Sequence, residues 1–201
     1  MARTLLVIEV VSLDGVMQAP GRPGEDDRGG FSQGGWASAA FAAAPEAAGA
    51  QQAAMSAEAG PTVMLFGRQS YLDLLHQWLE VAGDNPFAAS FRAQQKYVVS
   101  NTLTEPLPYE NSTLLSGDGV ARVRELKKTG DGTIVVLGSG DLVRQLARAG
   151  LIDQYLLNQV PVVLGSGQRL FDGVVANLEV LSSENSTTGI TLTRYAVLQP
   201  K

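Results

Sequence analysis

The sequence predicts an α/β protein with a mixed, mostly parallel sheet and a C-terminal antiparallel hairpin. Up to Gly150, short apolar runs without alternation, typical of strands covered on both faces, are followed by segments with helical spacing of apolar residues. This alternation of strands and helices predicts a parallel sheet. In the last third, residues 178–183 and 190–198 flank the turn-forming segment 185–189, which predicts the hairpin.

The strongest single signal is the stretch 133–141, read as a buried strand, a glycine turn and the start of a helix. Ile134 to Leu137 form the strand, Gly138-Ser139-Gly140 the turn, and Gly150 ends the helix. Backbone N–H groups at such a helix start point outward, and the helix dipole favours negative charge, so the junction suits a phosphate. The alternative is that this turn only connects two elements.

A second strand–glycine–helix junction follows residues 62–66, where Gly67, Arg68, Gln69 and Ser70 begin a helix. Arg68 is poorly placed for the helix dipole unless it reaches over a bound anion. A third strand, residues 96–99, ends in the small polar residues Ser100 and Asn101, which could hold a ribose or phosphate. Ligands of open α/β sheets bind beyond the carboxyl ends of the strands, so these three ends together favour a nucleotide ligand with several phosphates.

The first strand, residues 4–11, is apolar except for Glu9. A carboxylate inside such a strand is costly unless it is paired or protonated, so Glu9 is expected at a solvated or paired position, with a role in a site as the alternative. Residues 12–15 then form a turn.

Residues 18–35 form a long glycine-rich loop that contains Pro20, Pro23 and six glycines. Loops of this length are often lids or binding segments, and the aromatic residues Phe31 and Trp36 could cover a flat ligand. The alternative is a variable surface loop. The alanine-rich stretch 37–59 that follows favours helix, and Pro45 and Gly49 predict two pieces.

Composition excludes several classes of protein. The chain has 201 residues, which predicts one domain, and no cysteine, which excludes disulfides and thiol catalysis. A single histidine, His76, makes a metal cluster or a Ser-His-Asp triad unexpected, and we expect it at the surface. The 15 basic and 20 acidic residues form no basic cluster, which argues against nucleic acid and anionic membranes as partners. Without a signal peptide or a spanning apolar run, the chain is expected to be cytoplasmic.

The turn at residues 138–140 does not complete a standard Rossmann fingerprint. Val143 stands where the third glycine of that motif would be, and the turn lies deep in the chain instead of near its start.

The chain resembles the dihydrofolate reductase superfamily, and within it the branch similar to the C-terminal reductase domain of the bifunctional riboflavin-biosynthesis protein. The motifs that carry the resemblance cover almost the whole chain and occur in the family's order: residues 10–15, 64–71, 96–100, 135–140, 151–155 and 161–167.

This resemblance implies a single three-layer α/β/α domain that holds NADPH and transfers a hydride to a small heterocyclic or imine-like substrate of pterin or pyrimidine amino-sugar type. It also implies a homodimer. The residues implied to contact the cofactor are Val10, Val11, Gly67, Arg68, Gln69, Ser70, Ser100, Asn101, Gly138, Ser139, Gly140, Asp141 and Leu142. The residues expected on the substrate side are Ile8, Phe31 and Trp36.

The proton donor is not assigned by the resemblance. Dihydrofolate reductases carry a carboxylate on the helix after the first loop, where this chain has residues 36–41 without an acid. Glu46 is the nearest acid, and Asp14, Asp26 and Asp27 are other candidates, although Asp14 is equally explained as a turn residue. A nucleotide-binding module without turnover therefore remains an alternative, as does a flavin-binding reductase.

Overall fold

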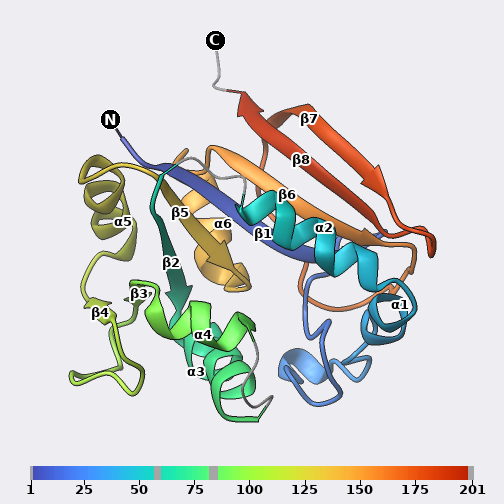
Figure 1. Cartoon of the computed structure of the whole chain (residues 1–201), viewed down its shortest axis with the longest axis horizontal. Coiled ribbons are helices and arrows are strands. Elements are labelled where there is room, and N and C mark those ends of the chain that lie inside the picture. The colour runs from blue at the N-terminus through green and yellow to red at the C-terminus, as the bar shows by residue number, and fades with distance from the viewer. Residues whose placement is uncertain (1, 57–59, 82–85, 199–201) are drawn as a thin grey trace. The chain divides into compact units, whose positions relative to one another are not determined.

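The computed structural model describes residues 2–56, 60–81 and 86–198, and within them the strands form an eight-stranded mixed sheet (Figure 1). The strand order is β4-β3-β2-β5-β1-β6-β8-β7. The sheet combines parallel strands with a C-terminal antiparallel hairpin, as predicted. The strands are β1 (Thr4–Ser12), β2 (Thr62–Gly67), β3 (Lys96–Val99), β4 (Ser112–Leu115), β5 (Thr133–Leu137), β6 (Gln154–Val160), β7 (Asn177–Asn185) and β8 (Thr191–Leu198).

The helices are α1 (Ser38–Ala43), α2 (Pro45–Ser56), α3 (Arg68–His76), α4 (Pro86–Ala93), α5 (Gly119–Lys128) and α6 (Gly140–Arg148). A short 3-10 helix, η1 (Arg28–Gly30), lies in the long loop, and a π-helical turn, η2 (Gln77–Val81), continues α3. None of the helices in the described ranges is long and apolar enough to cross a membrane.

The chain divides into two compact units, and the predicted single domain stays a prediction. Unit 1 comprises residues 1–6 and 59–151, and unit 2 comprises residues 7–58 and 152–201. Strand β1 contributes its first residues to unit 1 and the others to unit 2.

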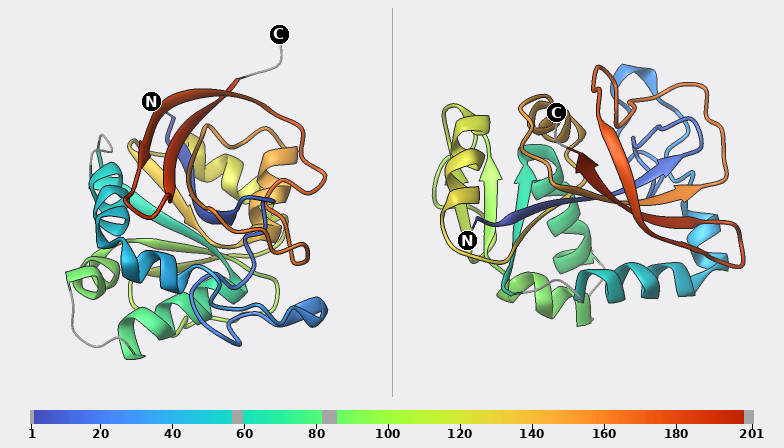
Figure 2. Two further views of the ribbon diagram at one scale, coloured as in Figure 1. Left: turned by 90° about the vertical axis from the view of Figure 1, so that its right-hand side faces the viewer. Right: turned by 90° about the horizontal axis from the view of Figure 1, so that it is seen from above.

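In unit 1, parallel pairing aligns the carboxyl ends of three strands. Gly67 at the end of β2 pairs with Val99 at the end of β3, and Leu65 pairs with Val136 of β5. All five residues of β5 are buried, as its unbroken apolar sequence predicts for a strand covered on both faces. Helices α3 and α4 lie on one side of these strands and α5 and α6 on the other (Figures 1 and 2).

A buried lysine ties α4 to the sheet of unit 1. Lys96 at the start of β3 is 0% exposed, and its Nζ donates hydrogen bonds to the carbonyl oxygens of Phe91 at 2.6 Å and Gln94 at 2.7 Å. A cation at the C-terminal end of a helix satisfies carbonyls that lack partners within the helix and interacts favourably with the helix dipole. Burial lowers the pKa of Lys96, because desolvation disfavours its charged form.

In unit 2, β7 and β8 form the predicted antiparallel hairpin, and β8 also pairs antiparallel with β6 (Figure 2). Helices α1 and α2 are separated at Ala44, directly before Pro45, as predicted. The predicted two helical pieces are thus confirmed, and Gly49 lies inside the second of them. A glycine inside a helix costs only about 1 kcal/mol. A proline inside a helix costs more, because it has no backbone N–H and its ring clashes with a carbonyl of the preceding turn.

Alanines make close helix-on-sheet packing possible in unit 2. Ala37, Ala44 and Ala47 form a buried cluster with Val160 of β6 and Ile190, next to β8. Glu9 of β1 is also buried, at 5% exposed, so the solvated position considered for it is wrong.

Candidate functional site

Unit 1 brings the two strand–glycine–helix junctions together. The backbone N–H of Gly67, at the end of β2, donates a hydrogen bond of 2.9 Å to the hydroxyl oxygen of Ser139, which precedes α6. Gly138, in the turn before α6, lies close to the start of α3, because a Cβ added to it would come within 3.1 Å of Ser70 Oγ. Its φ of +61° is one that residues other than glycine rarely adopt. The two helix starts therefore lie side by side.

Neither helix is capped by the side chain of its N-cap residue, among the residues that the structure describes. The N-cap of α3 is Gly67, which has no side chain, and the hydroxyl of the α6 N-cap, Ser139, is directed to Gly67. Ser139 has a left-handed backbone, with φ of 65° and ψ of 42°. The backbone N–H groups in the first turn of a helix without a side-chain cap can bind phosphates and other anions.

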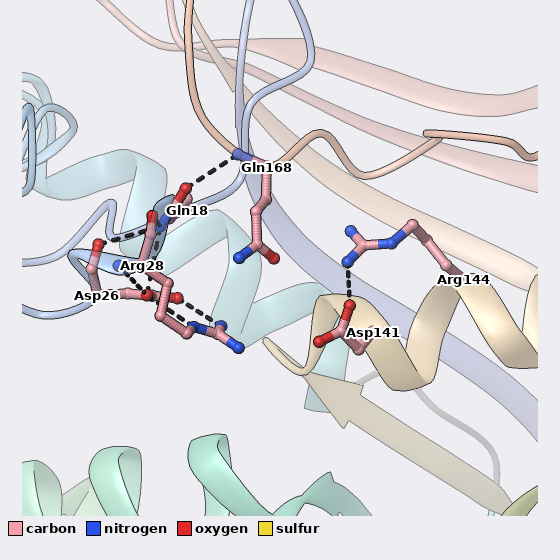
Figure 3. Close-up of polar contacts among 6 residues, drawn as sticks. All are labelled: Gln18, Asp26, Arg28, Asp141, Arg144 and Gln168. Carbon is pink, nitrogen blue, oxygen red and sulfur yellow. Dashed lines mark hydrogen bonds and ion pairs between the residues drawn. The ribbon is translucent and has the colours of Figure 1, made fainter. Parts of the chain in front are cut away.

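The charges beside the two helix starts are opposite in sign. Arg68 is the exposed first residue of α3. Asp141 lies in the first turn of α6 and is paired with Arg144, one turn further along the same helix (Figure 3). Arg144 was missed by sequence analysis, although its position three residues after Asp141 is a recognisable signal for an ion pair on a helix.

Ser100 and Asn101, at the third strand end, hold the backbone of their own loops. Ser100 Oγ accepts hydrogen bonds of 3.1 Å from the N–H groups of Thr102 and Leu103. The side chain of Asn101 accepts a hydrogen bond of 2.6 Å from the N–H of Gly117 and donates one of 3.2 Å to the carbonyl oxygen of Gly117. These contacts fix the loop after β3, and a contact of either residue with a cofactor stays a prediction.

The residues expected beside the nicotinamide and the substrate all belong to unit 2. Ile8 and Val11 are buried in β1, and Val10 is half-buried. Phe31 is 7% exposed and packs with Val16 and Ala19, so a large part of its ring surface serves the core of the unit. Their proposed roles at a substrate are not tested by this packing.

A buried glutamine holds the long loop in place. Gln18 Nε2 donates to the carbonyl oxygen of Arg28 at 2.9 Å and to that of Asp26 at 3.2 Å, and its Oε1 accepts from the N–H of Gln168 at 3.0 Å (Figure 3). Its backbone carbonyl oxygen accepts from the indole N–H of Trp36 at 2.8 Å. Gln18 is 4% exposed, and it was missed by sequence analysis because a glutamine in a loop carries no pattern.

Asp14 is surrounded by hydrogen-bond donors in the turn after β1. Its carboxylate accepts from Ser12 Oγ at 2.7 Å and from the backbone N–H groups of Leu164 at 3.1 Å and Gly165 at 2.9 Å. Arg169 forms an ion pair with it at 3.4 Å. The Ser12 hydroxyl and then the backbone donors hold the pKa of Asp14 far below its usual range.

The other acidic candidates lie elsewhere on unit 2. Glu46, in the first turn of α2, accepts from the hydroxyl of Thr187 at 2.5 Å and from its N–H at 3.0 Å, which lowers the pKa of Glu46. Asp26 is held by Arg28, whose hydrogen bonds lower the pKa of Asp26. Asp27 is exposed and directly precedes η1.

His76 lies at the exposed end of α3, as expected. Its Nδ1 is 2.8 Å from Glu80 Oε2, and Glu80 Oε1 accepts a hydrogen bond of 3.0 Å from the hydroxyl of Tyr109. Burial and the contact with Glu80 raise the pKa of Tyr109 to about 12. This partner of the histidine four residues along the helix was not expected from the sequence.

The mixed sheet, its C-terminal hairpin and the glycine junctions define a dihydrofolate-reductase-like α/β fold. The family model for the RibD C-terminal domain matches residues 3–192, so the chain belongs to that family.

Individual relatives agree with this assignment. The uncharacterized protein YyaP of Bacillus subtilis is 29% identical over 134 residues, which cover 63% of this chain and 69% of that protein. A putative riboflavin biosynthesis protein from Shewanella sp. PV-4 has a TM-score of 0.61 at 22% identity, with 99% of this chain and 100% of that chain covered. Dihydrofolate reductase from Enterococcus faecalis, in complex with NADP(H), has a TM-score of 0.60 at 11% identity, with the same coverage. At these identities the structural likeness shows the fold.

Proposed function

We propose that this protein is an NADPH-dependent reductase that transfers a hydride to a small heterocyclic or imine-like substrate. The observation that carries the proposal is the contact between the two helix starts, Gly67 to Ser139, with Arg68 exposed beside them. Membership of the RibD C-terminal domain family and the fold shared with dihydrofolate reductase support a reductase.

The residues of unit 1 fit the phosphates of such a cofactor. The first turns of α3 and α6 offer backbone N–H groups, and Arg68 and Ser70 add a cation and a hydroxyl. Gly138 allows the two helix starts to lie close together, because a side chain there would crowd Ser70. When bound, NADPH would supply the hydride, and the protein would supply binding, orientation and exclusion of water.

Hydride transfer to such a substrate also requires a proton. A good general acid has a pKa close to the working pH, whereas hydrogen bonds lower the pKa values of Asp14 and Glu46. We therefore assign these two residues to loop anchoring, together with Asp26, whose pKa is lowered by its hydrogen bonds with Arg28, and we propose Asp27 or a water molecule as the source of the proton. The same observation favours the second candidate function, a nucleotide-binding module without turnover.

The test is a titration of the full chain with NADPH and with NADH, followed by a turnover screen with dihydrofolate and a pyrimidine amino-sugar. We expect saturable NADPH binding and oxidation of NADPH with one substrate class. NADPH binding without any turnover would favour the nucleotide-binding module. No binding of either nucleotide would contradict both, and the absorption spectrum of the isolated protein would reveal a flavin. A homodimer, which the resemblance implies, would be measured by sedimentation in the same buffer.

A further inference from the structure

The first turn of α6 carries a carboxylate, which is an unfavourable group where a diphosphate is proposed to bind. The helix begins at Gly140, and the side chain of Asp141, the next residue, is 68% exposed. A carboxylate at this position stabilises the empty helix start through the helix dipole. A phosphate at the same turn would place two like charges within a few ångströms of each other, and their repulsion would weaken binding.

Arg144 brings the opposite charge to the same turn. Its guanidinium donates a hydrogen bond to Asp141 Oδ1 and forms an ion pair with it (Figure 3). Long side chains on a helix lean toward its N-terminus, so a residue three positions later delivers its charge to the first turn. Arg144 is 9% exposed and follows the buried residues Leu142 and Val143. Such burial restricts the guanidinium to few positions, and arginine keeps its charge there.

We propose that Arg144 is a positioning residue, which neutralises Asp141 and so allows the start of α6 to accept the diphosphate of a nicotinamide cofactor. The inference rests on the proposed function and adds to it the residue pair that controls the charge of this site. Asp141 thus has two roles: it stabilises the first turn of α6 through the helix dipole, and its pairing with Arg144 limits its repulsion of a bound anion.

Three variants of the full chain test this inference, with isothermal titration of NADPH and of inorganic pyrophosphate as the measurement. Asp141→Asn removes the carboxylate that repels a phosphate at this turn, and we expect NADPH to bind about 3- to 10-fold more tightly. Arg144→Gln removes the positive charge that faces this carboxylate, and we expect binding about 10-fold weaker. The double variant carries neither charge, and its affinity should return to within about twofold of wild type.

The double variant separates neutralisation from a direct contact. If Arg144 itself bound the phosphate, the double variant would stay clearly weaker than wild type because the direct contact is lost, and the inference would be overturned. Unchanged or weaker NADPH binding by Asp141→Asn would overturn it as well. Asp141 is exposed, so this variant decides the question even if thermal unfolding shows that Arg144→Gln does not fold.

A matched control lies on α5, where Glu125 pairs with Lys128 at the same three-residue spacing and a distance of 3.0 Å. Glu125→Gln should leave both affinities unchanged. The proposed function and this inference fail in different ways. If wild type binds pyrophosphate but not NADPH and the variants keep the expected order, the reductase proposal is wrong and the inference stands. If wild type binds neither ligand, both are wrong.

Discussion

The hydroxyl oxygen of Ser139 accepts a hydrogen bond from the backbone N–H of Gly67 at 2.9 Å, so the N-cap residue of α6 holds the backbone at the start of α3. The two residues are 72 positions apart in the chain. Ser139 keeps this contact although its left-handed backbone, with φ of 65°, is one that favours glycine. The Ser139 hydroxyl thus adds a direct hydrogen bond between two helix starts whose preceding strands, β2 and β5, are also paired.

Ser139→Ala should weaken NADPH binding by about 3- to 10-fold, because the loss of one hydrogen bond, on the order of 1 kcal/mol, loosens the two phosphate contacts together. Ser139→Gly removes the same hydroxyl and also relieves the left-handed strain, so it should bind equally weakly but unfold at a higher temperature than Ser139→Ala. Titration and thermal unfolding measure the two effects. Wild-type affinity in both variants would show that the hydroxyl does not organise the site.

Arg68→Ala should reduce NADPH affinity by roughly 10- to 100-fold, because a hydrogen bond to a charged group contributes about 1.5–3 kcal/mol. Arg68 is exposed, so stability should change little, and thermal unfolding checks this. Arg124→Ala is the matched control, an exposed arginine on α5 that should leave affinity unchanged. Equal affinities in wild type and Arg68→Ala would remove Arg68 from the phosphate site.

Asp14→Asn should lower the stability of the protein at pH 7, because the ionised carboxylate accepts hydrogen bonds from Ser12, Leu164 and Gly165. The folded state holds the pKa of Asp14 below the ordinary value of 3.8. Its contribution to stability is therefore complete above that pH and is lost as the pH falls toward the lower pKa of the folded protein.

The difference in urea midpoint between wild type and Asp14→Asn should accordingly shrink as the pH falls below about 4, where unfolded aspartate becomes protonated. Asp27→Asn, at an exposed position of the same unit, should show no such difference. A midpoint difference that stays constant down to pH 2 would show that the carboxylate charge is not what anchors the loop. Turnover retained by Asp14→Asn would confirm that Asp14 is not the proton donor.

Gln18→Leu should destabilise the protein by on the order of 2–3 kcal/mol, because it removes several hydrogen bonds that a buried side chain makes to backbone groups. The variant loses the hydrogen bonds from Gln18 Nε2 to the carbonyl oxygens of Arg28 and Asp26. It also loses the hydrogen bond from the N–H of Gln168 to Gln18 Oε1. Urea unfolding provides the measurement. Gln33→Leu is the control, because this glutamine of the same loop is exposed and its bond to the carbonyl oxygen of Leu164 can be replaced by water. Equal losses in the two variants would contradict a special role for Gln18.

Much of the fold follows from local patterns in the sequence. The apolar run of β5 and the glycine turn after it predicted a buried strand and the start of α6, and both occur where expected. The hairpin of β7 and β8 was predicted from its turn residues. Such features depend on residues that are close together in the sequence, so the sequence pattern alone predicts them. The two helical pieces of the alanine-rich stretch were also predicted: Pro45 separates α1 from α2, whereas Gly49 lies inside α2 because one glycine costs a helix only about 1 kcal/mol.

The sequence by itself determined the helices and strands, the two glycine junctions, the polar end of the third strand and the residue types available for binding. Only the tertiary structure decided which side chains act on which element. The hydroxyl of Ser139 serves Gly67, 72 residues away, and the carboxylate of Asp14 serves Leu164, 150 residues away. The physical reason is that a polar side chain takes whatever partner the packing of strands and helices brings within about 3 Å, and no periodic pattern in the chain records that partner.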